Sequence, residues 1–219
     1  MFAALLSLAV LAAPAPPSAV ALARKVQAYY EATRDLEARF VQTYTYAAGG
    51  RSQVSRGVLR VKKPGKMRWD YTEPAPKSIV VNGSRLSQYE PEANQVYVDE
   101  RFDATAMSAA VTFLLGKGSL EREFVPTLGA GGELLLAPRK PDARVERVEL
   151  TVRGDGEVTG TRVVDGSGNV NAIAFESIRR NPGLKDSVFT LDLPRDVHRI
   201  EVPAAPRPAA GSPPGGATR

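Results

Sequence analysis

Residues 57–98 constrain the fold of this chain more than any other stretch. They contain short runs of alternating side chains, divided by the turn signals Pro64-Gly65, Glu73-Pro74 and Asn82-Gly83. Turns this short make consecutive strands antiparallel neighbours, because a parallel pair needs a long crossover connection. The stretch therefore predicts an antiparallel meander.

The strand predicted at residues 66–71 has two unlike faces. Met67, Trp69 and Tyr71 lie on one face, and the charged residues between them lie on the other. A sheet face that carries three large apolar side chains has to be covered, either by another part of the chain or by a bound molecule.

Comparable alternation predicts strands along most of the chain. A helix over residues 18–32, with Ser18 as its N-cap, precedes the first strand. A short apolar helix is predicted over residues 105–115, which lack turn residues and end at Gly116. The predicted strands are 40–47, 53–62, 66–71, 77–81, 85–89, 95–98, 121–125, 133–137, 144–152, 157–164, 170–177 and 187–193. A sheet of about eleven or twelve strands has to curl toward a barrel or a half-barrel.

The two ends of the chain differ from the region between them. The apolar run 2–13 is too short to cross a bilayer, which takes about 20 helical residues. It is typical of a secretory signal peptide, although the usual basic segment is missing, and we expect residues 1–15 to be removed. A core helix beginning at Phe2 is the alternative. Residues 203–219 are dense in Pro, Gly and Ala, which predicts a disordered tail after one folded domain, 16–202.

The composition argues against several functions. The net charge is +5, but the basic residues are spread along the chain, so nucleic-acid binding is not expected. There is no cysteine and only one histidine, His198, which we expect at the surface. No metal-binding spacing and no serine-nucleophile motif accompanies that histidine. We therefore expect neither an enzyme nor a protein with a metal or cofactor.

The apolar side chains of the predicted strands allow two interpretations. They form an ordinary core covered by the two helices, or the curled sheet and the helix at 105–115 enclose a cavity. Flexible Met and Leu side chains suit a cavity for acyl chains of varied shape. The candidate cavity residues are Phe40, Leu59, Val61, Met67, Trp69, Tyr71, Val96, Met107, Phe113 and Leu114.

Residues 20–202 contain several short motifs in a fixed order. They are Phe40-Val41-Gln42, Gly57-x-Leu59, the KKPGKMRWDY run at 62–71, Glu73-Pro74, Asn82-Gly83, the LSQYEP run at 86–91, Asn94-Gln95-Val96, the FTLDLP run at 189–194, Val197 and Ile200. The individual motifs are loose, but by their order and spacing this region resembles the LolA family, periplasmic carriers of lipoproteins to the outer membrane.

The resemblance implies an incomplete β-barrel with helices as a lid, which binds the acyl chains of lipoproteins in the periplasm. It also implies partners: acylated lipoproteins, an inner-membrane ABC-type exporter and an outer-membrane receptor, with the carrier acting as a monomer. Trp69 matches the family's cavity tryptophan. Lys63 stands where the family often has an arginine that hydrogen-bonds the lid. Lysine keeps the charge but lacks the planar fork of donors.

Two other functions stay open on the same fold. One is a lipid-binding sensor of envelope stress, although such proteins usually carry a further C-terminal domain and we expect nothing folded after Val202. The other is a carrier of a different lipid. A hydrolase that uses His198 is a more distant alternative.

Overall fold

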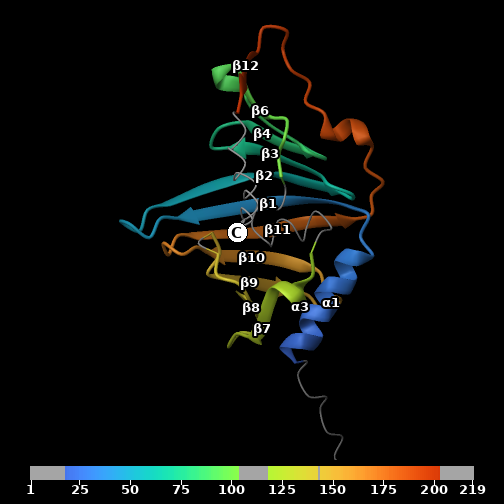
Figure 1. Ribbon diagram of the computed structural model, residues 1–219, viewed down its shortest axis with the longest axis vertical. Helices are drawn as coiled ribbons and strands as arrows, with labels where there is room; N and C mark the ends of the chain where they lie inside the picture. Colours follow the sequence, from blue (N-terminus) through green and yellow to red (C-terminus); the bar gives the residue numbers. More distant parts are fainter. Residues whose placement is uncertain (1–17, 104–117, 143, 203–219) are drawn as a thin grey trace, which may run out of the picture.

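The computed structural model describes residues 18–103, 118–142 and 144–202, and their twelve strands form one sheet (Figure 1). The strand order is β12-β6-β5-β4-β3-β2-β1-β11-β10-β9-β8-β7. The strands are β1 (Asp35–Thr45), β2 (Ser52–Lys62), β3 (Lys66–Glu73), β4 (Lys77–Asn82), β5 (Arg85–Glu90), β6 (Gln95–Asp99), β7 (Phe124–Leu128), β8 (Leu134–Pro138), β9 (Arg147–Val152), β10 (Val158–Val164), β11 (Val170–Arg180) and β12 (His198–Glu201). The helices are α1 (Ala19–Glu31), α3 (Leu120–Glu123) and the short 3₁₀ turns η1 (Pro91–Ala93) and η3 (Asp186–Phe189).

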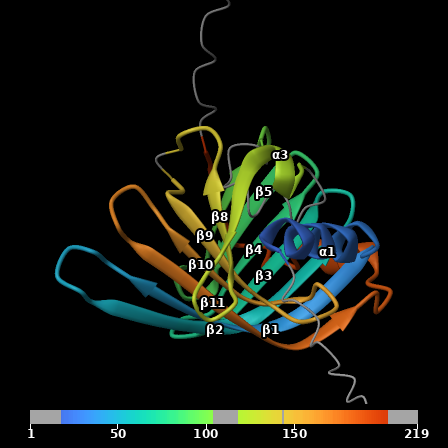
Figure 2. The same ribbon diagram turned by 90° about the horizontal axis from the view of Figure 1, so that it is seen from below.

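The sheet curls around α1 without closing. Figure 2 shows the helix inside the curve, with the strands bent around it. Among the described strands, β7 and β12 are the two edges, and they do not pair with one another. The predicted incomplete antiparallel barrel is therefore confirmed, and so are its hairpins at Pro64-Gly65 and Asn82-Gly83. No helix in the described residues is long and apolar enough to span a membrane.

Helix α1 forms as predicted because both its start and its buried side are encoded locally. The Ser18 hydroxyl accepts a hydrogen bond from the Ala21 amide at 3.2 Å, which caps the first turn. Leu22, Val26 and Tyr30 share its buried side and pack on the core formed with strands β7 to β10. Burial of this side places α1 over the concave face of the sheet.

One predicted strand is wrong, one is displaced, and one strand was not predicted. The strand predicted at 121–125 overlaps β7 only at Phe124 and Val125, because residues 120–123 form α3 and contact α1. The Leu120 amide donates to the Gln27 side chain at 3.1 Å, and Arg24 pairs with Glu121 at 2.6 Å. Residues 187–193 contain η3 and no strand, whereas β12 forms later and pairs in parallel with β6. The helix predicted at 105–115 lies outside the described residues.

Residues 181–201, which we call the C-terminal strap, follow β11, run beside the ends of the strands and return to the sheet as β12 (orange to red in Figure 1). Its residues 188–190 contact the convex face of the sheet. Arg68 donates from Nη1 to the carbonyls of Val188 and Thr190, at 2.8 and 3.3 Å. Asp186 pairs with Lys62 and Lys66, whose hydrogen bonds lower the pKa of this carboxyl to about 2. The two Arg68 bonds occupy backbone carbonyls within residues 187–193, which explains why this segment forms no strand.

Candidate functional site

The described residues enclose an apolar cavity on the concave face of the sheet, beside α1. Its volume is about 270 Å³, near the lower end of the range for small-molecule sites. Its apolar walls come from α1, α3, β3, β1 and strands β7 to β11, and its charged residues Arg144 and Asp165 lie just outside strands β9 and β10. The lining residues are Tyr30, Tyr44, Trp69, Leu120, Phe124, Leu136, Arg144, Val148, Leu150, Val158, Thr161, Val163, Asp165, Asn169, Asn171, Ile173 and Phe175.

Three aromatic rings form one wall of this concave region. Phe40 contacts Trp69 edge-on with a centroid distance of 4.8 Å, and it contacts Tyr71 in the same way at 5.1 Å. The Trp69 indole N–H donates to the sulfur of Met67 at 3.0 Å. Edge-to-face pairs stabilise beyond their buried area, so the rings hold each other in place. The wall is therefore rigid and apolar.

Gly57 lies beneath this wall and makes its packing possible. A Cβ atom at this position would overlap the carbonyl oxygen of Asp70 on the neighbouring strand. It would also lie 2.9 Å from Cε1 of the Phe40 ring. Only glycine lets Phe40 lie this close to the sheet.

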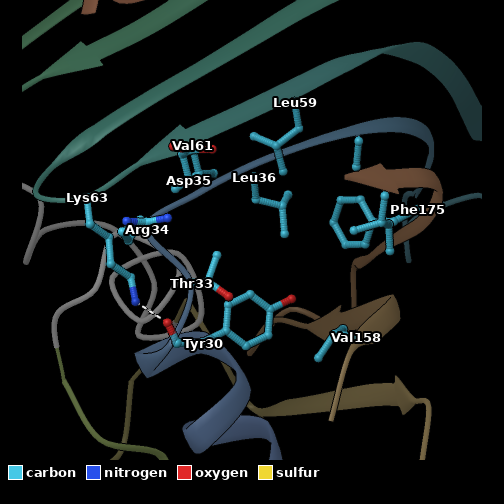
Figure 3. Close-up of a pocket in the computed structure, with 12 residues that line it drawn as sticks. Tyr30, Thr33, Arg34, Asp35, Leu36, Leu59, Val61, Lys63, Val158 and Phe175 are labelled. Carbon is cyan, nitrogen blue, oxygen red and sulfur yellow. Dashed lines mark hydrogen bonds between the residues drawn. The ribbon is translucent and has the colours of Figure 1, made fainter. Parts of the chain in front are cut away.

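Lys63 connects the C-terminal end of α1 to the sheet through a hydrogen bond. Its Nζ, which reaches from the turn after β2, donates a hydrogen bond to the carbonyl oxygen of Tyr30 in the last turn of the helix (Figure 3). That turn carries no basic residue of its own, so Lys63 supplies the positive charge that favours a helix C-terminus. Burial lowers the pKa of the Lys63 ammonium group. Leu36, Leu59 and Phe175 line the small cleft next to this bond.

Comparisons with known proteins identify the family to which this chain belongs. The profile described as "Outer membrane lipoprotein carrier protein LolA" matches residues 31–192. The chain belongs to this family. It is 31% identical to an outer-membrane lipoprotein carrier protein of Methylobacillus flagellatus over 173 residues, which cover 77% of this chain and 83% of the relative. A protein of the same name from Dechloromonas aromatica is 32% identical over 168 residues, or 74% and 79% of the two chains. These names describe carriers rather than enzymes.

A solved structure supports the fold. An uncharacterized conserved protein from Thermus thermophilus superposes with a TM-score of 0.51 and 11% identity, over 83% of this chain and 97% of that one. At this identity the likeness concerns the fold alone. This likeness in fold agrees with the open, curled sheet of the present chain.

The structure brings six of the predicted cavity residues together on the concave face. Phe40, Leu59, Val61 and Met67 are buried in one cluster, against which Trp69 and Tyr71 pack. Among these six, Trp69 lines the main cavity, while Leu59 and Val61 line the smaller cleft near Lys63.

Val96 lies on the convex face of the sheet, so it does not line the proposed cavity. The strand register places it in line with Tyr89 and Ser78, on the side of Asp70 rather than of Trp69. There it is buried, and with Phe189 of the C-terminal strap it lines a different hollow. The predicted cavity residues Met107, Phe113 and Leu114 lie outside the described residues.

Sequence reasoning missed the half of the cavity that comes from β8 to β11. Leu136, Val148, Leu150 and Phe175 line it, and all four come from the second half of the chain. The alternation in these strands was visible, but it does not say which set of positions faces inward. The pairing of Phe40 with Phe175 across β1 and β11 supplies that information.

Replacing Lys63 with methionine should loosen the end of α1 while leaving the sheet intact. Methionine keeps the length of the side chain but removes the donor. We expect a loss of about 1 kcal/mol, because the lysine is partly exposed and its charge partly screened, and a fall in Tm of about 2–4 °C. Thermal unfolding and amide exchange of residues 28–32 measure this. Lys63→Arg keeps a donor and should retain most of the parent protein's stability. Lys140→Met, at an exposed lysine, should leave the Tm unchanged. Equal exchange in Lys63→Met and the parent protein would contradict the assignment.

Proposed function

We propose that this protein is a periplasmic chaperone that binds the acyl chains of lipoproteins released from the inner membrane and carries them to the outer membrane. The observation that carries the proposal is the apolar cavity of about 270 Å³, walled by Trp69 and Phe175 and covered by α1. Membership of the LolA family supports the same cargo.

The size of the cavity supports partial burial of the cargo. Burying a methylene group contributes ~0.8 kcal/mol, so a fully buried sixteen-carbon chain would contribute roughly 12 kcal/mol. Three such chains would exceed the practical limit of non-covalent affinity, about 18–21 kcal/mol. A carrier that binds this tightly could not release its cargo without an energy source. A small cavity beside an open sheet favours binding that remains reversible.

The remaining parts of the proposal rest on the family and on the ends of the chain. Residues 1–15 direct export and are removed, residues 16–202 form the carrier, and residues 203–219 form a tail. An inner-membrane ABC-type exporter loads the carrier, and an outer-membrane receptor unloads it. The carrier works as a monomer and without a cofactor.

A release assay tests the proposal. Spheroplasts with labelled lipoproteins are incubated with the purified protein comprising residues 16–219, and the supernatant is analysed for a soluble complex. We expect lipoproteins to co-purify with the carrier, because the cavity shields part of their acyl chains from water. A folded protein that releases no lipoprotein would contradict the proposal, and mass spectrometry of its extracted ligands would then identify another lipid cargo.

A further inference from the structure

A line of hydrogen-bonded polar side chains crosses the otherwise apolar concave face. The Tyr71 hydroxyl on β3 donates to Gln42 Oε1 on β1 at 3.1 Å, and Gln42 Nε2 donates to Asn171 Oδ1 on β11 at 2.8 Å. We call Tyr71, Gln42 and Asn171 the polar ladder. All three side chains are partly buried, so each hydrogen bond forms in surroundings with little water.

The fold makes room for this ladder. Tyr71 and Gln42 lie on strands separated by β2, where Ser55 and Gly57 are the facing residues. Because both of these are small, the tyrosine can reach across β2 to the glutamine. Burial raises the pKa of Tyr71, so the hydroxyl keeps its proton and remains a donor.

The ladder ends at the cavity with a donor. Asn171 lines the cavity, between Tyr44 on β1 and Ile173 on its own strand. Its Oδ1 accepts from Gln42, and no hydrogen bond within residues 18–103, 118–142 and 144–202 uses its Nδ2 group. An amide NH₂ group has two donors. The preceding hydrogen bonds polarise the Asn171 amide and fix its orientation.

We propose that Asn171 Nδ2 donates a hydrogen bond to an ester carbonyl of a diacylglyceryl group, and so sets the depth to which the acyl chains enter the cavity. This inference rests on the proposed function. The hydrocarbon of an acyl chain suits the apolar walls at Leu136 and Phe175, and the first polar atom along the chain is a carbonyl oxygen, which can only accept. Asn171 offers the matching donor where the apolar lining gives way to the polar residues Asp165 and Asn169 of the β10–β11 turn.

The test compares two synthetic lipopeptides with the same peptide and the same sixteen-carbon chains, one with ester links and one with ether links that lack carbonyls. Full-length mature protein is titrated with each by fluorescence of Trp69. We expect the ester form to bind about fivefold more tightly, which corresponds to about 1 kcal/mol for one hydrogen bond between neutral groups. Asn171→Leu should bind both forms equally, and Asn171→Asp, which has no donor, should also lose the preference.

Thr43→Val is the matched control, because Thr43 lies next to Gln42 on β1 but faces the convex side. It should keep the fivefold preference, and thermal unfolding confirms that each variant is folded. Competition with dipalmitoyl phosphatidylglycerol distinguishes the two sources of a diacylglyceryl group: a lipoprotein-specific subsite resists displacement, and a general one does not.

Two results would overturn the ladder's role and are distinct from failure of the proposed function. The parent protein could bind the ester and ether forms equally, or Asn171→Leu could keep the preference; both leave a lipoprotein carrier without this subsite. If the parent protein binds neither lipopeptide, the proposed function fails, and the assignment of the ladder fails with it.

Discussion

Replacing Trp69 with glutamate is expected to abolish the release of lipoproteins by a protein that still folds. The Trp69 ring lines the cavity and contacts the Phe40 ring edge-on, with 4.8 Å between the ring centroids. A carboxylate at this position can stay hydrated while the cavity is empty, because Trp69 is only half-buried. When an acyl chain fills the cavity, the charge has to lose its water without gaining a partner, which costs several kcal/mol.

The expected loss of affinity for a synthetic triacylated lipopeptide is at least about 100-fold, since about 2.8 kcal/mol already gives that factor. The same spheroplast assay should yield no soluble complex. Trp69→Phe is the matched control, because it keeps an aromatic ring and should retain most of the release. Normal release by Trp69→Glu would remove Trp69 from the acyl-chain site and would leave the proposed cavity without its principal wall residue.

The parts of the fold that sequence reasoning predicted are those encoded by neighbouring residues. Pro64-Gly65 and Asn82-Gly83 each turn the chain within a few residues, so the β2–β3 and β4–β5 hairpins follow from local rules. Ser18 likewise determines the start of α1. The errors occur where distant residues decide the outcome. Arg68 binds the carbonyls of Val188 and Thr190 from about 120 positions away, and no local pattern reveals that contact.

The candidate site shows the same division. Trp69 and Met67 could be predicted, because they alternate with charged residues on a single strand and match a family motif. Val96 was placed on the wrong face, because its direction depends on the register through two intervening strands, and a shift of one residue reverses it. Phe175 could not be found, because its place opposite Phe40 arises only when β1 pairs with β11. The pairing of strands distant in sequence completes the cavity.

Gly57→Ala is expected to destabilise the fold by about 3 kcal/mol, the upper end of the cost of overpacking a core. The added Cβ would meet the Asp70 carbonyl oxygen and the Phe40 ring at once. Neither neighbour can move freely. The Asp70 backbone belongs to the β2–β3 pairing, and Phe40 is held by Trp69 and Tyr71. Relief of the overlap therefore requires separation of the strands or disruption of the aromatic wall.

Urea denaturation followed by circular dichroism measures this loss, which is a large share of the roughly 5–15 kcal/mol typical of a domain. Gly154→Ala is the control, because a Cβ there would have no atom within 4 Å. It should leave stability unchanged or raise it by about 0.4–1 kcal/mol, because alanine restricts the unfolded chain. Equal stability of the two variants would mean that β2 and β3 can separate at Gly57 without cost. The contacts among the three aromatic rings, and not the absence of a side chain at Gly57, would then determine where the aromatic wall lies.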